Sequence, residues 1–170
     1  MHPSGFVLLV WTAPAVRRLL GKPARKVLLS FREAADHFSA NQVEFTGLPV
    51  RKEFFAIRPK PMTGELNILI TGGSRGSQRI NNAVRGAWPD LKNLPVRIVH
   101  QTGTADLLAI SKDFKETGLQ GSVVPFIPDM PKAFSDAHLV ICRSGAGTVS
   151  ELAAAGRASV LIPFPFAADD

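Results

Sequence analysis

Residues 66–77 read Leu-Asn-Ile-Leu-Ile-Thr-Gly-Gly-Ser-Arg-Gly-Ser, an apolar run that passes directly into a glycine-rich turn. The apolar run, Leu66–Thr71, has the length and composition of a buried strand, and a helical pattern begins near residue 77. Glycines let the backbone approach a ligand, and the start of a helix offers unpaired amide groups to a phosphate. The stretch therefore predicts phosphate or nucleotide binding, with a plain turn capped by Ser77 as the alternative.

The same alternation of apolar runs and amphipathic stretches continues to the end of the chain. Further strands are expected at residues 96–101, 122–126, 138–142 and 159–162, and helices near residues 77–87, 104–117, 130–136 and 148–155. Strands that alternate with helices form βαβ units, in which the strands are parallel and the crossovers right-handed. The predicted fold class is therefore α/β with a Rossmann-like parallel sheet, whose ligands bind at the carboxyl ends of the strands.

The first 60 residues have a different pattern and predict two strands without a complete sheet. The strands are expected at residues 26–31 and 43–46, and helices at residues 14–20 and near 32–38. The apolar stretch Phe6–Val10 predicts either a buried strand or an irregular start. Prolines then punctuate residues 49–61, as in a connector between domains. We expect a first segment at residues 1–47, a linker at 48–64 and a domain at 65–170.

The charge of the chain is concentrated at one end. Of 170 residues, 20 are Lys or Arg and 14 are Asp or Glu, which gives a formal net charge of +6. Residues 1–60 hold ten of these cations and four of the anions, so the whole excess lies there. This asymmetry indicates an anionic partner such as nucleic acid, a membrane surface or a phosphorylated substrate, with a solvated basic face as the alternative.

Composition excludes several classes of protein. A hydrophobic fraction of 45% is that of a folded chain and not of a disordered one. The single cysteine, Cys142, excludes a disulfide within the chain and a cysteine-based zinc site, and fits a reducing compartment. The longest mainly apolar stretch, Phe6–Val16, is shorter than the roughly 20 residues that a membrane-spanning helix needs.

Two further loops follow expected strands. In Cys142–Glu151, Thr148 and Glu151 have the spacing of a capping box; alternatively, the loop amides hold a diphosphate and the Glu151 carboxylate accepts hydrogen bonds from ribose hydroxyls. In the loop that begins at Phe126, Asp129 is the expected N-cap of the next helix, and the Ile127 backbone is available to a flat base. The spacing alone does not decide between capping and binding.

Catalytic groups are sparse in this sequence. No Gly-Lys-Ser/Thr ends the first glycine loop, which excludes a Walker loop, and the next strand ends at Gln101 without the acidic residue of an NAD site. The four histidines lack the spacing of metal ligands, no Asp-x-Asp pair occurs, and neither a metal nor a cofactor is expected. The sequence therefore predicts a nucleotide site without a visible general base.

Five motifs in this order resemble the MurG family of peptidoglycan glycosyltransferases. They are Ile70–Ser77, His100–Gly103, Phe126–Met130, Cys142–Leu152 and Pro163–Asp170, and the resemblance extends back through Gly47–Arg51. It implies the GT-B architecture, in which two Rossmann-like domains flank a cleft and the second domain binds the donor. It also implies a hexosyltransferase that moves N-acetylglucosamine from UDP-N-acetylglucosamine to lipid I, undecaprenyl-diphospho-muramoylpentapeptide.

The resemblance further implies partners and a location. The partners are UDP-N-acetylglucosamine, lipid I and an anionic inner-membrane surface, with no nucleic acid. The location is peripheral, at the cytoplasmic face of the bacterial inner membrane, in a pathway that serves cell-wall synthesis, cell shape and cell division.

Residue by residue, the resemblance places the family's donor site on one linker residue and three loops. The implied contacts are Arg51, Ser74, Ile127, Ala146, Gly147, Thr148, Val149, Ser150 and Glu151. Ser74 and the amides of residues 146–148 would face the diphosphate, Ile127 the uracil, Glu151 the ribose and Arg51 the donor from the linker.

The family's amino-terminal glycine-rich loop, whose histidine is the expected catalytic base, has no counterpart here. No catalytic residue is therefore expected in this chain. We expect residues 1–47 to be the tail of the acceptor domain and residues 65–170 most of the donor half-site, and we expect the chain by itself not to catalyse transfer. Two other interpretations stay open: a nucleotide-binding module of another UDP-sugar enzyme such as an epimerase, and a basic nucleic-acid-binding protein.

Overall fold

The computed structural model describes residues 7–9 and 24–163, with side chains for residues 24–163 except His37. They form two compact units, one that ends at Pro49 and one that begins at Val50. The helix expected at residues 14–20 lies outside the described residues. Within the part of the chain that the structure describes, no helix is long and apolar enough to cross a membrane.

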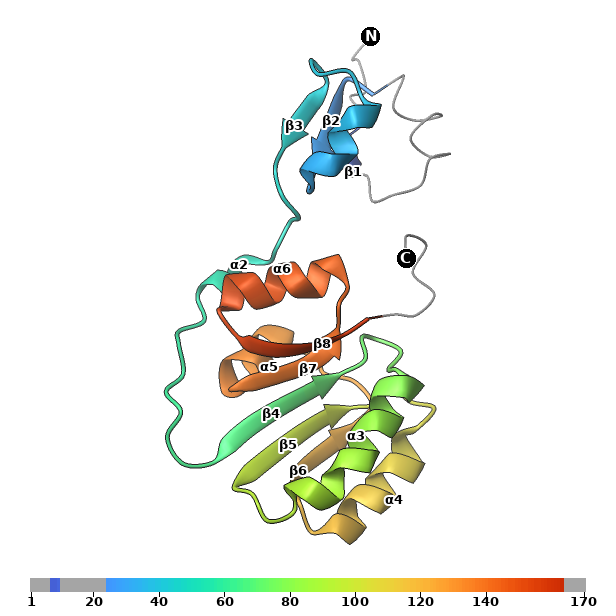
Figure 1. Ribbon diagram of the computed structural model, residues 1–170, viewed down its shortest axis with the longest axis vertical. Coiled ribbons are helices and arrows are strands. Elements are labelled where there is room, and N and C mark those ends of the chain that lie inside the picture. The colour runs from blue at the N-terminus through green and yellow to red at the C-terminus, as the bar shows by residue number, and fades with distance from the viewer. Residues whose placement is uncertain (1–6, 10–23, 164–170) are drawn as a thin grey trace. The chain divides into compact units, whose positions relative to one another are not determined.

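The N-terminal unit contains a small parallel sheet. Strands β1 (Val7–Leu9), β2 (Lys26–Leu29) and β3 (Val43–Phe45) lie in the order β1-β2-β3, and the 3-10 helix η1 (Arg32–His37) connects β2 to β3 (Figure 1). Val27 and Leu29 are fully buried and pack with η1 and β3. The count of two strands is wrong, because β1 pairs with β2 as a third, and of the two interpretations of Phe6–Val10 the strand is confirmed.

The second unit is a five-stranded parallel sheet in the order β6-β5-β4-β7-β8. The strands are β4 (Leu66–Thr71), β5 (Val96–Gln101), β6 (Gln120–Val124), β7 (Leu139–Arg143) and β8 (Ala158–Ile162). The helices that connect them are α3 (Gln78–Leu91), α4 (Leu107–Thr117), α5 (Met130–Asp136) and α6 (Ala146–Ala155). The expected alternation of strands and helices is confirmed, and so is the α/β fold class.

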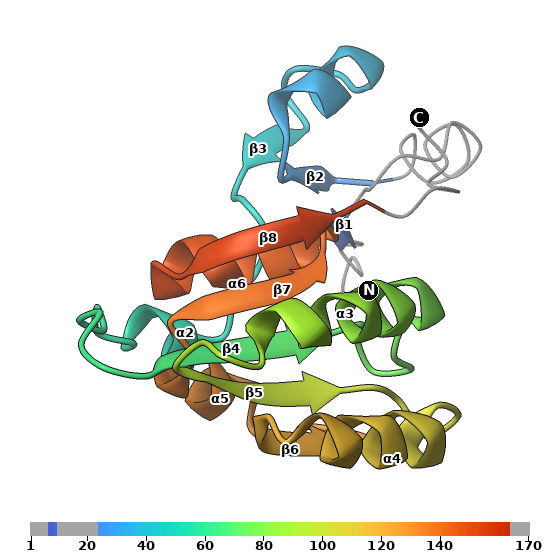
Figure 2. The ribbon, with the colours of Figure 1, turned by 60° about the horizontal axis from the view of Figure 1, so that its bottom comes forward.

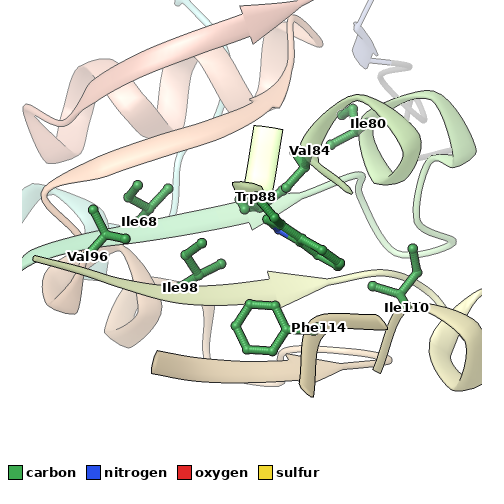
Figure 3. Close-up of a cluster of buried hydrophobic side chains, with 9 residues drawn as sticks. Ile68, Ile80, Val84, Trp88, Val96, Ile98, Ile110 and Phe114 are labelled. Carbon is green, nitrogen blue, oxygen red and sulfur yellow. The ribbon is translucent and has the colours of Figure 1, made fainter. Parts of the chain in front are cut away.

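The helices cover both faces of this sheet (Figure 2). Alternate residues of β4 point to opposite faces: Ile68 and Ile70 pack with α3 and α4, whereas Leu69 packs with α5 and α6. Figure 3 shows the first of these cores, in which Trp88 of α3 lies against Phe114 of α4 with ring centroids 5.3 Å apart. Apolar runs without polar alternation are what a doubly covered strand requires.

A short helix holds the preceding segment onto the second face. In α2 (Lys52–Phe55), Phe54 is fully buried and meets Phe134 of α5 edge to face, with centroids 5.1 Å apart. The buried Arg157 donates from Nη2 to the carbonyl oxygen of Arg58 at 2.9 Å. These contacts fix Arg51, which directly precedes α2, beside this unit.

The strand order reverses direction between β4 and β7, which are neighbours in the sheet. The chain continues from β4 into α3 on one face and from β7 into α6 on the other. The two loops therefore diverge at the carboxyl edge and leave a crevice, the place where open α/β sheets bind ligands.

Candidate functional site

A cleft of about 490 Å³ lies at this crevice. Its walls come from the loop after β4, the loop after β7, the first two turns of α6 and the first residue of α5. The charged residues that line it are Arg75, Arg143 and Glu151. Two guanidinium groups against one carboxylate give the lining a net positive charge, which suits an anionic ligand.

The glycine loop after β4 is packed tightly against the turn after β5. Gly76 has φ +76°, and a Cβ there would overlap the carbonyl oxygen of Thr102. A Cβ on Gly103, which has φ +80°, would overlap the carbonyl oxygen of Arg75. Gly73 also has a positive φ, +83°, but a Cβ there would meet nothing within 4 Å. A Cβ on Gly72 would likewise overlap the backbone N of Ser77. Glycine is therefore required by close packing at Gly72, Gly76 and Gly103, and by backbone conformation alone at Gly73.

Buried polar side chains hold the turn after β5, against which the glycine loop packs. Asn81 of α3 donates from Nδ2 to the carbonyl oxygen of Thr102 at 3.1 Å and to Asp106 Oδ2 at 2.7 Å. Its Oδ1 is therefore the acceptor for His100 Nε2, 3.0 Å away. His100 is fully buried, and this burial lowers its pKa to about 4, so it is neutral at pH 7.

A second buried chain of hydrogen bonds crosses the ends of three strands. The hydroxyl of Thr71 accepts from the Gly73 N–H at 3.2 Å and donates to Gln101 Oε1 at 2.7 Å. Gln101 Nε2 donates to the carbonyl oxygen of Pro125 at 3.1 Å. Thr71 and Gln101 are 3% and 2% exposed, so these bonds are shielded from water.

The opposite wall is the amino end of α6. Gly145 is the N-cap, and the first intrahelical hydrogen bond runs from the Val149 N–H to the Gly145 carbonyl at 2.9 Å. The N–H groups of Ala146, Gly147 and Thr148 precede that bond and lie at the positive end of the helix dipole. Thr148 is thus the third helical residue, and the capping-box interpretation of Thr148 and Glu151 is wrong. By contrast, Asp129 caps α5 as expected, since its Oδ1 accepts from the Lys132 N–H at 2.9 Å.

Instead of capping, the Glu151 side chain contacts Arg51. Arg51 Nη2 lies 3.4 Å from Glu151 Oε1, and the Arg51 guanidinium also stacks 4.9 Å from the centre of the Phe54 ring. Within the described residues, Glu151 Oε2 has no hydrogen-bond partner. A carboxylate at the edge of the cleft therefore keeps an acceptor for a ligand.

The thiol that lines the cleft is protonated, and the described residues do not group as metal ligands. Burial raises the pKa of Cys142 to about 11, so its sulfur is a neutral thiol at pH 7. No three His, Cys, Asp or Glu side chains of residues 24–163 are grouped as metal ligands. What the arrangement provides is recognition of an anion and of hydroxyl groups.

The structure brings together only some of the residues that the sequence singled out. Ser74, Thr148 and Glu151 line the cleft, and Arg51 adjoins it through Glu151. Ala146 is buried and Gly147 is exposed at the start of α6. Val149 borders a separate hollow between α6 and β8, and Ser150 is half-buried outside the cleft lining.

Ile127 is placed differently from Ser74 and Glu151. Its side chain packs on the core beneath α5 and borders a second, mainly apolar hollow of about 450 Å³. From this third loop, the residue that reaches the cleft is Met130. The contact of the Ile127 backbone with a base stays a prediction, as do the roles of the other expected ligand contacts.

Sequence reasoning placed two residues of the carboxyl edge in its motifs without giving either of them a role. Thr71 and Gln101 end neighbouring apolar strands, pair in register and are buried. A polar residue at the last position of each strand was the available signal. Their partners could not be read from it, because the strand order decides which loops meet.

Residues 67–170 match the model of the glycosyltransferase family 28 C-terminal domain, which is more than half of the chain. The chain belongs to this family. Two curated relatives carry the name UDP-N-acetylglucosamine--N-acetylmuramyl-(pentapeptide) pyrophosphoryl-undecaprenol N-acetylglucosamine transferase. The protein of Solibacter usitatus (strain Ellin6076) is 56% identical over 155 residues, and that of Syntrophotalea carbinolica (strain DSM 2380 / NBRC 103641 / GraBd1) is 49% identical over 157 residues. Each alignment covers 90% of this chain and 43% of the relative.

Solved structures agree with the fold. The crystal structure of Acinetobacter baumannii MurG superposes with a TM-score of 0.68 at 36% identity and covers 90% of this chain, which spans 43% of that one. The glycosyltransferase SnogD from Streptomyces nogalater superposes with a TM-score of 0.54 at 22% identity over 86% of this chain and 40% of SnogD, a likeness of fold alone. The resemblance to the MurG family and the GT-B fold class are confirmed, and the interpretation as an epimerase module is not supported.

Proposed function

We propose that the cleft binds UDP-N-acetylglucosamine, as the donor site of an N-acetylglucosaminyltransferase that acts on lipid I. The observation that carries the proposal is the meeting of three features at the topological switch point: the glycine loop of residues 72–77, the free amides that begin α6, and the Glu151 carboxylate. The names of the relatives in Solibacter and Syntrophotalea support the choice of nucleotide sugar.

Each feature matches one part of the ligand. A diphosphate carries two negative charges and several acceptors, which the helix amides and the Arg75 and Arg143 guanidinium groups complement. A ribose presents neighbouring hydroxyl donors, which the carboxylate of Glu151 accepts.

Calorimetric titration of the 170-residue chain with UDP-N-acetylglucosamine tests this proposal. Glu151→Ala removes the acceptor for the ribose, and a hydrogen bond to a charged group of about 1.5 kcal/mol or more corresponds to at least about tenfold weaker binding. Glu116→Ala, which removes an exposed carboxylate on α4, is the matched control and leaves the affinity unchanged. The absence of binding to the unaltered chain, or equal effects of the two substitutions, would contradict the proposal.

For the location, we propose that the basic amino-terminal segment faces an anionic membrane surface, where lipid I resides, and that it does not bind nucleic acid. The described cations Arg25, Lys26 and Arg32 are all exposed, and they belong to the stretch that holds the whole excess charge. Sedimentation with phosphatidylglycerol vesicles should show salt-sensitive binding, and phosphatidylcholine vesicles should show none. Binding to duplex DNA at the same salt concentration, with no binding to the anionic vesicles, would show that the basic segment binds nucleic acid and not a membrane.

A further inference from the structure

Gln101 occupies a central place at the carboxyl edge of the sheet. It is the last residue of β5, the middle strand of the three, and pairs in register with Thr71 of β4 and Val124 of β6. The loop after β4 holds the glycines of the cleft, and the loop after β6 leads through Phe126 to Met130. A side chain at this position can therefore reach both loops.

The hydrogen bonds of Gln101 have a fixed direction. A carbonyl oxygen only accepts, so the contact with Pro125 at 3.1 Å requires the Nε2 end of the amide. Oε1 then faces Thr71, whose hydroxyl donates to it at 2.7 Å and is left to accept from the Gly73 N–H at 3.2 Å. The amide thus links Gly73, in the glycine loop, to the residue that directly precedes Phe126.

Burial makes this bridge rigid. Gln101 is 2% exposed, so water does not compete for its hydrogen bonds, and a rearrangement would leave a buried polar group unpaired. Pro125 has no N–H, so its carbonyl oxygen is the only polar backbone atom it offers to the sheet. Gln101, through Thr71, is therefore a side-chain link between the two loops, beside the backbone bond from the Thr102 N–H to the Val124 carbonyl oxygen at 3.0 Å.

We propose that Gln101 is a positioning residue that fixes the spacing between the glycine loop, expected to hold the diphosphate, and the loop after β6, expected to contact the base. This inference rests on the proposed function, because only a ligand that spans both loops, a nucleoside diphosphate, uses that spacing. The affinity of a ligand that contacts the glycine loop alone does not depend on the spacing between the loops. Gln101 therefore affects the affinity for a nucleoside diphosphate, whose two parts contact two subsites at a fixed distance from each other.

The test compares UDP with inorganic pyrophosphate as probes, titrated into the full chain and its Gln101→Met variant. Methionine has a similar volume and length, so it fills the same space without the two polar atoms. We expect UDP to bind the variant at least about tenfold more weakly and pyrophosphate to change less than about threefold. Equal weakening of both probes, unchanged UDP affinity, or no pyrophosphate binding to the unaltered chain at millimolar concentration would overturn the proposal.

A matched control separates positioning from a general loss of stability. Asn67 of β4 also donates from its side-chain amide to a backbone carbonyl, that of Asp136 at 2.9 Å, but at the amino end of the sheet. Asn67→Leu should lower the melting temperature without changing the ratio of UDP to pyrophosphate affinity. If the unaltered chain does not bind UDP, the proposed function fails; if Glu151→Ala weakens UDP binding and Gln101→Met does not, the positioning role alone fails.

Discussion

Arg51 Nη2 lies 3.4 Å from Glu151 Oε1 although the two residues are 100 positions apart in the chain. The two side chains are 53% and 26% exposed, so water screens the attraction. An ion pair of this kind contributes less than about 1 kcal/mol to stability. The contact is therefore better suited to holding Glu151 at the edge of the cleft than to holding the fold together.

A double-mutant cycle with Arg51→Met and Glu151→Gln tests this. We expect a coupling free energy of unfolding below about 1 kcal/mol, measured by urea denaturation. The affinity for UDP-N-acetylglucosamine should fall in both single variants, because Arg51 orients the carboxylate that Glu151 presents. A coupling of several kcal/mol with unchanged affinity would make the pair a structural element only.

The glycine loop gives a second prediction, from two glycines three positions apart. Both need a positive φ, but a Cβ at Gly76 would overlap Thr102 whereas a Cβ at Gly73 would meet nothing within 4 Å. Gly73→Ala should therefore destabilise by about 1–2 kcal/mol, the ordinary cost of a left-handed conformation. Gly76→Ala should cost clearly more, because the loop must also move away from residues 102–103. Equal losses in urea denaturation would show that the two loops are not in firm contact.

The success of the sequence in locating β4 and β5 has a physical reason. Each strand contains a run of apolar residues, Ile68–Ile70 in β4 and Ile98–Val99 in β5, and Glu65 and Gly72 mark the two ends of β4. The third strand was expected at residues 122–126 and lies at Gln120–Val124. Pairing with Arg97–Gln101 of β5 begins at Gln120, so β6 starts with residues that the apolar pattern did not include. Pro125 lacks an N–H and cannot extend the hydrogen-bonded ladder.

The sequence predicted the site less completely than the fold. The loops themselves were found, because glycines and strand ends are local signals. The beginning of α6 was placed two residues late, since Thr148 resembles an N-cap while Gly145 occupies that position. The pairing of Gln101 with Pro125, and of Arg51 with Glu151, depends on which strands are neighbours and on where α2 docks. Neither is encoded by local spacing.

His100 predicts a pH dependence of stability. In the unfolded chain it takes up a proton near pH 6.5, and in the folded chain only near pH 4, because it is buried. Between these values the unfolded state binds more protons, so stability falls as the pH falls from about 6.5 to 4. The loss amounts to about 3 kcal/mol at most.

His100→Gln removes the titrating group and keeps an amide that can donate to Asn81 Oδ1. Urea denaturation from pH 7 down to about pH 4.5 should show a smaller decrease in the variant than in the unaltered chain. The other titrating groups are common to both proteins, so the difference isolates His100. Parallel pH profiles would show that water reaches the imidazole in the folded state.

The edge strand β8 gives the last prediction. Among the described residues it pairs only with β7, and its apolar side chains Val160 and Leu161 are 48% and 41% exposed. An exposed apolar edge is a template for pairing with another chain, and a lysine there opposes such pairing. Val160→Lys should therefore reduce concentration-dependent self-association in sedimentation velocity. Leu108→Lys, which replaces an 85% exposed leucine on α4, is the matched control and should leave it unchanged. If both substitutions reduce association equally, general surface hydrophobicity and not the strand edge is responsible.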